Sequence, residues 1–135
     1  MKFSEINPSA ALKTLLVAEG VTETVYADGE RPTSKLPSKF VDISNNGYVS
    51  TPCSQFGYYE QTLLVSVNVK LTPMGTKDLV SEAALMAKFD EIFKGTPING
   101  KYSFSVSKAS LFGGSKNLIA GYSTKLMNIV STIQN

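Results

Sequence analysis

A run of regular alternation between apolar and polar side chains, from Tyr58 to Leu71, most constrains the fold of this chain. Every second residue of its main part is apolar: Leu63, Val65, Val67, Val69 and Leu71. The opposite face carries Leu64, Ser66, Asn68 and Lys70. A period of two places the apolar set on the core side of a half-buried β-sheet. The chain must therefore fold around a sheet whose buried side is covered by other elements.

Four further segments are predicted as strands from their β-branched and aromatic content or from alternation: Val21 to Tyr26, Lys39 to Ser44, Lys101 to Lys108 and Asn117 to Ile133. The last segment leaves an alternative open, a helix at Leu126 to Ile133. Between the first two, Pro32 and Pro37 indicate an extended surface loop, because proline donates no hydrogen bond to a sheet. Short turns between consecutive strands imply mainly antiparallel pairing.

Two segments have helical spacing. Asn7-Pro8 is typical of a helix start, and Gly20 suits the cap that follows a short helix over Ser9 to Glu19. A second helix is predicted over Thr76 to Lys94. The sequence thus predicts a single α+β domain spanning residues 1–135. In it, one mainly antiparallel or mixed sheet packs against one long helix, with a short N-terminal helix beside it.

Composition narrows the chemistry that this chain can perform alone. It has no histidine, which removes the usual general base at neutral pH and the commonest metal ligand. The single cysteine, Cys53, cannot form an internal disulfide, so a reducing compartment is allowed. A net charge of +2 is too small to indicate a nucleic-acid or acidic-membrane partner. Without a signal-peptide pattern or a membrane-spanning apolar run, we expect a soluble intracellular protein.

Individual candidates for chemistry have simpler structural explanations. A nucleophilic Cys53 would need a nearby lysine or helix terminus to lower its pKa, and a small buried or loop thiol is the simpler interpretation. Gly113-Gly114-Ser115-Lys116 lacks the spacing of a phosphate-binding loop and indicates a hairpin turn. Four lysines of the last third form a basic patch only if strands align them, and otherwise protect sheet edges: Lys101, Lys108, Lys116 and Lys125.

The carboxylates show no catalytic or metal-binding spacing. Asp78 and Glu82 lie one turn apart at the start of the second predicted helix, where negative charge is favourable. Glu82 and Asp90 are about two turns apart. We therefore predict no catalytic, cofactor-binding or metal-ligating residue and no enzymatic activity.

The order of elements resembles a known family on a defined set of residues. They are Val25-Tyr26, Arg31-Pro32, Pro37, Phe40-Val41-Asp42-Ile43, the strand from Leu63 to Val69 that leads into a helix at Leu79 to Phe93, and the closing strand from Tyr122 to Val130. In this pattern the chain resembles the tail-terminator and tail-completion proteins, which join head to tail in long-tailed bacteriophages and prophages. The resemblance spans nearly the whole chain, but no short motif carries over to individual residues.

The resemblance implies a structural subunit of the phage or prophage tail, or of the head–tail connection. Such subunits form rings, commonly hexamers, that contact the tail tube and connector proteins. No cofactor, nucleic acid or membrane is implied, and the location would be the bacterial cytoplasm or the virion. The alternative is a small ligand- or peptide-binding module without catalysis, with an apolar pocket and a few polar groups. An enzyme using carboxylates, lysine or an added metal is a third hypothesis, which requires carboxylates that converge in one cleft.

Overall fold

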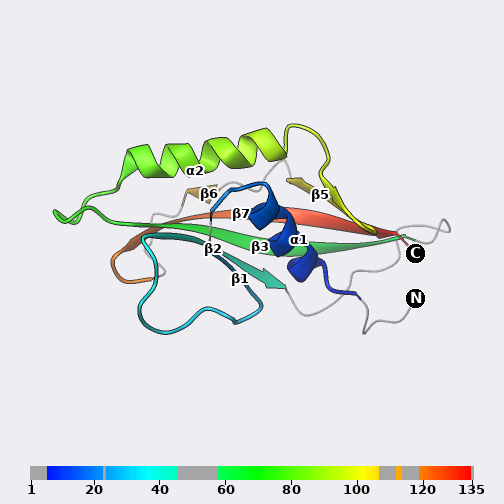
Figure 1. Ribbon diagram of the computed structural model, residues 1–135, viewed down its shortest axis with the longest axis horizontal. Coiled ribbons are helices and arrows are strands. Elements are labelled where there is room, and N and C mark those ends of the chain that lie inside the picture. The colour runs from blue at the N-terminus through cyan, green and yellow to red at the C-terminus, as the bar shows by residue number, and fades with distance from the viewer. Residues whose placement is uncertain (1–5, 23, 46–57, 107–111, 114–118, 135) are drawn as a thin grey trace.

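The computed structural model describes residues 6–22, 24–45, 58–106, 112–113 and 119–134. Its strands form one seven-stranded sheet: β1 (Val25–Ala27), β2 (Lys39–Asn45), β3 (Tyr58–Lys70), β4 (Ile98–Asn99), β5 (Tyr102–Val106), β6 (Phe112–Gly113) and β7 (Tyr122–Gln134). The order across the sheet is β1-β2-β3-β7-β5-β4, and β6 also pairs with β7 (Figure 1). β1 runs parallel to β2, whereas the other described pairs are antiparallel.

The centre of the sheet is the pair of 13-residue strands β3 and β7. They pair along their whole length, from Tyr58 opposite Gln134 to Lys70 opposite Tyr122. The alternation seen in the sequence is confirmed, since Leu63, Val65, Val67 and Val69 are all buried. The predicted closing strand is also confirmed over β7, and the alternative helix at 126–133 is wrong.

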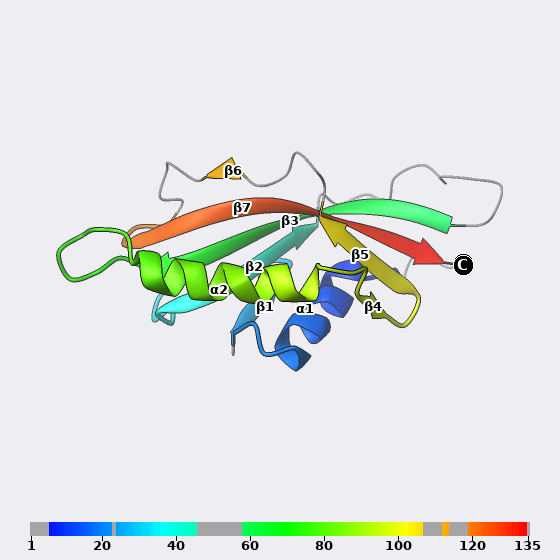
Figure 2. The same cartoon turned by 90° about the horizontal axis from the view of Figure 1, so that it is seen from above.

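Two helices cover one face of the sheet, α1 (Pro8–Ala18) and α2 (Leu79–Ile92) (Figure 2). As predicted, Asn7 caps α1, its side chain accepting the Ala10 N–H at 3.1 Å, and Gly20 ends it with φ +72°. Side chains from both helices enter one core with the strands, and the helical members are Leu12, Leu16, Leu85 and Phe89. This face of the sheet is called the helix face below.

The prediction of one long helix against the sheet, with a short one beside it, is wrong. Among the described residues there is no single long helix, because α1 has 11 residues and α2 has 14. α2 is shorter than predicted because Asp78 caps it and Thr76 stays in the preceding turn, where its backbone carbonyl accepts the Thr72 N–H. The sheet curls into a half-barrel, and both helices pack against its helix face.

The start of the sheet also differs from the prediction. Of the predicted strand Val21 to Tyr26, only Val25 and Tyr26 are in β1, which extends to Ala27. Thr22 and Thr24 instead belong to the connection from α1. A strand this short leaves the first residue of β2, Lys39, without a neighbour from β1, since the pairing of β1 begins at Val41.

The opposite face of the sheet has a small core of its own around Phe40, which is fully buried. Its ring meets Tyr26 at 5.6 Å and Tyr122 at 5.5 Å between centroids, both in edge-on geometry. The Tyr122 hydroxyl donates toward the backbone carbonyls of Leu36 and Pro37, at 3.0 and 2.6 Å. These contacts bring the proline-containing loop between β1 and β2 against this face, as an extended connection that the two prolines permit.

Candidate functional site

Several of the sequence candidates lie outside the described residues, namely Cys53, Lys108 and Lys116, and so does most of the glycine-rich segment. Of the four lysines, Lys101 and Lys125 are described. They lie toward opposite ends of β7. Lys101 precedes Tyr102, which pairs with Ile133, and Ile133 is eight residues along β7 from Lys125. At about 3.3 Å per residue this is roughly 26 Å, so these two lysines do not form a common patch.

The described carboxylates are used in local structure. Asp78 accepts the Ser81 N–H at 3.1 Å, and this bond, with one from the Ser81 hydroxyl, holds the pKa of Asp78 below its ordinary value. Glu82 is buried and accepts a hydrogen bond from the Ser123 hydroxyl of β7, so it fastens α2 to the sheet. Among the described residues, no three cysteine or carboxylate side chains converge as metal ligands would.

A second acidic pair lies where β1 ends. Asp28 accepts from the Ser9 hydroxyl and from the backbone N–H of Asn45, which ties α1 to the end of β2. Asp42 pairs with Arg31 at 3.1 Å. Burial raises the pKa of Asp42, although the Arg31 guanidinium opposes the shift. Both carboxylates are thus bound by other residues of the chain and stabilise local structure.

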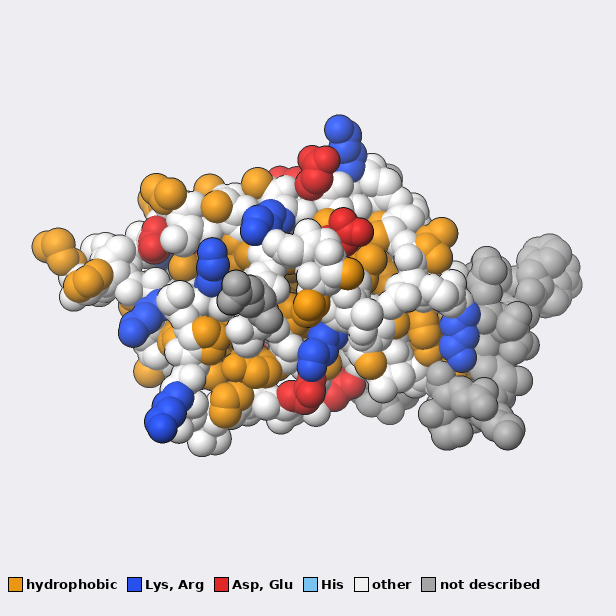
Figure 3. Space-filling model, viewed as in Figure 1, with side chains coloured by type: hydrophobic (Ala, Val, Ile, Leu, Met, Phe, Trp, Pro, Cys, Tyr) orange, Lys and Arg blue, Asp and Glu red, His pale blue; other side chains and the backbone are white. Residues whose placement is uncertain are grey.

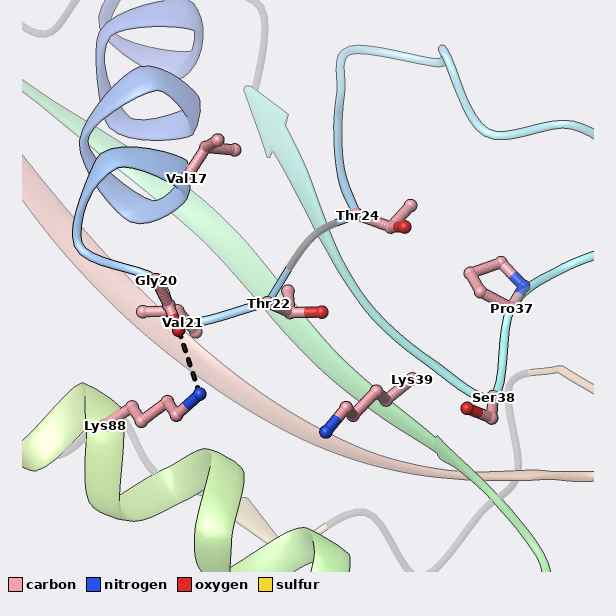
Figure 4. A pocket seen from close by; sticks show the side chains of 9 residues that line it. All are labelled: Val17, Gly20, Val21, Thr22, Thr24, Pro37, Ser38, Lys39 and Lys88. Carbon is pink, nitrogen blue, oxygen red and sulfur yellow. Dashed lines mark hydrogen bonds between the residues drawn. The ribbon is translucent and has the colours of Figure 1, made fainter.

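A large hollow of the described surface lies between α2 and the connection that follows α1. Its volume is about 710 Å³, within the usual range of ligand pockets, and it is open on one side. Figure 4 shows the nine residues that line it: Val17, Gly20, Val21, Thr22, Thr24, Pro37, Ser38, Lys39 and Lys88. We call it the lysine pocket.

The two lysines of this pocket come from different elements and point toward one another (Figure 4). Lys88 extends from α2 and donates to the backbone carbonyl of Gly20 at 2.9 Å, where the negative end of the α1 dipole favours a cation. Lys39 starts β2 on its helix face, in register with Val69. Neither Lys39 nor Lys88 forms an ion pair with a described residue.

A second feature is the outer face of α2, which we define by Val80, Ala83, Ala84 and Ala87. All four residues are exposed, Val80 to 81%. They repeat at helical spacing on the side opposite the buried Leu85 and Phe89. Figure 3 shows apolar side chains along the upper edge of the molecule over the first part of α2, and charged side chains farther along the same edge. Charged residues occur on this side only in the last turns of α2, where Asp90 and Glu91 are exposed. The first turns of α2 are thus apolar on both sides, which is typical of a helix segment that is covered on both sides.

The sequence analysis missed both features. The available signal for the outer face of α2 was the spacing of its alanines, which places them on the far side of the helix from Phe89. The lysine pocket joins residues that are far apart in the chain, and the alternation of Lys39 with Val41 and Ile43 was the available signal. Neither described helix is long and apolar enough to cross a membrane.

Comparison with known proteins identifies the fold alone. No family model and no curated protein matches the sequence. A solved structure of a protein without a functional name is similar over 93% of this chain and 92% of its own, with a TM-score of 0.58 and 13% identity. The structure of the bacteriophage SPP1 gp17 protein is more loosely similar, with a TM-score of 0.46 and 17% identity over 98% and 95% of the two chains. At these identities neither likeness assigns a function.

Proposed function

We propose that this chain is a structural subunit of a phage or prophage tail, or of the head–tail connection, and acts by self-association and contact with other proteins. The outer face of α2 carries the proposal. A surface helix is expected to carry charged or polar residues along its outer side, and α2 does so only in its last turns, with Asp90 and Glu91. In its first turns four apolar residues are exposed together: Val80, Ala83, Ala84 and Ala87. The tail assignment itself comes from the order of elements in the sequence, which resembles the tail-completion proteins.

Apolar exposure continues from this face toward the turn before α2. Leu79 is 66% exposed, and Met74 at the tip of the turn is 89% exposed. The small alanine side chains would let the backbone of a neighbouring subunit approach closely, and burial of the larger side chains would supply hydrophobic free energy. The expected partners are copies of the chain in a ring, the tail tube protein and the connector.

Ala84→Glu tests this proposal, because it places a charge in the middle of the outer face. The molar mass in solution, measured by light scattering after size exclusion, is expected to exceed that of one chain and to rise with concentration. Ala84→Glu should weaken association by at least about tenfold, since burial of an unpaired charge is costly. Ala10→Glu is the matched control, because Ala10 is exposed on α1.

Two outcomes would count against the proposal. One is a mass equal to one chain at every concentration of the native protein. The other is equal weakening by Ala84→Glu and Ala10→Glu, which would indicate a general effect of charge. Circular dichroism of both variants shows that the fold is retained.

A further inference from the structure

The lysine pocket combines two ammonium groups with three hydroxyls. The hydroxyls belong to Thr22, Thr24 and Ser38, and none makes a hydrogen bond to another described residue. Lys88 uses one of its three N–H donors on Gly20, and Lys39 uses none within the described part of the chain. The described residues of the pocket thus present several hydrogen-bond donors and two positive charges.

Among the described residues, Lys88 has a structural contact and the Lys39 ammonium has none. Lys88 completes the end of α1, as its bond to Gly20 shows. Lys39 stands on the helix face of β2, two residues before the buried Val41, at a position where an apolar side chain would extend the core. The two like charges point into one hollow, and no described carboxylate lines it. Such an arrangement gains stability when an anion occupies the hollow.

We propose that the lysine pocket binds a small molecule that carries a carboxylate or phosphate group. The two ammonium groups would receive the oxyanion through charge-assisted hydrogen bonds, and the hydroxyls would donate to its remaining oxygens. Val17, Val21 and Pro37 provide an apolar wall for the rest of the ligand, and the volume of about 710 Å³ leaves room for it. This inference does not depend on the outer face of α2, since none of the four residues that define that face lines the pocket.

Titration with inorganic phosphate and, separately, with succinate tests the proposal at constant ionic strength, with chloride as the reference anion. Amide chemical shifts of residues 22, 24, 38, 39 and 88 are expected to move in a saturable way. Phosphate and succinate represent the two sources of an oxyanion, and the tighter binder identifies the class of group that the pocket prefers.

The decisive variant is Lys39→Gln, because Lys39 is exposed and its replacement leaves the Lys88 contact with α1 intact. It should weaken binding of the preferred probe by about tenfold or more, the effect of losing one charge-assisted hydrogen bond. Lys94→Gln is the matched control, since it removes the same charge from an exposed residue just beyond α2 and outside the pocket. It should bind like the native chain.

The proposal is overturned if neither probe moves these amides in a saturable way. It is also overturned if Lys39→Gln binds as well as the native chain, or if Lys94→Gln loses as much affinity as Lys39→Gln. The same samples give the molar mass, so loss of anion binding and loss of self-association are separate results.

Discussion

Replacement of Phe40 by alanine tests whether the face of the sheet opposite the helices holds a true core. Phe40 is fully buried and loses contact with two tyrosine rings, at 5.6 and 5.5 Å, when it is truncated. A buried phenylalanine costs about 3–5 kcal/mol on replacement by alanine. Each edge-on aromatic pair contributes about 0.5–1.5 kcal/mol beyond burial, so we expect the upper part of that range. Phe40→Leu keeps most of the volume and should cost about 1–2 kcal/mol.

The free energy of unfolding is measured by urea denaturation, followed by circular dichroism at equal protein concentration. Domains of this kind are stable by about 5–15 kcal/mol, so Phe40→Leu remains measurable even if Phe40→Ala is largely unfolded. Met74→Ala is the control, because Met74 is 89% exposed and should change stability by less than about 0.5 kcal/mol. A loss below about 1 kcal/mol for Phe40→Ala would refute the second core.

Two further predictions concern ionisable groups, both followed by urea denaturation. Tyr122→Phe removes the hydroxyl that donates to Leu36 and Pro37 and should cost about 1 kcal/mol. Burial raises the pKa of Tyr122 above 10.0. The difference in unfolding free energy between the native chain and Tyr122→Phe should therefore have its full size below pH 10 and disappear as pH rises through the folded-state pKa. A constant difference up to pH 12 would contradict this prediction. Burial also raises the pKa of Asp42 above 3.8, so the folded state favours the neutral acid. Asp42→Asn should therefore be more stable than the native chain at pH 7, with a gain that vanishes as pH falls below 3.8, and lower stability at pH 7 would show that the Arg31 pair dominates.

Local patterns predicted the elements whose burial follows one periodicity. Leu63, Val65, Val67 and Val69 alternate and are buried together on the helix face. Asn7 and Gly20 mark the two ends of α1, because capping depends on the residues of the helix end itself. In these places the sequence contains all the information that the structure uses.

Features that depend on tertiary contacts were not predictable in the same way. Phe40 is buried against Tyr26 and against Tyr122, which also holds the loop between β1 and β2 from the far end of the chain. The parallel pairing of β1 with β2 depends on the path of that same loop. The lysine pocket needs α1, α2 and β2 in place, so no local window of sequence contains it. Periodicity alone also overestimated the length of α2, because the end of a helix is decided by its capping residue and not by the spacing of its apolar residues.

The place of β7 in the sheet has a consequence for how this chain folds during synthesis. β7 follows every other described strand, yet it lies between β3 and β5. Until the ribosome has released it, β3 has one open edge and β5 has no central partner, so the nascent chain exposes strands that could pair with other molecules. The late, long-range closure of the sheet should make folding slow and cooperative. Chaperones that shield open strand edges would then matter most in the interval before β7 docks.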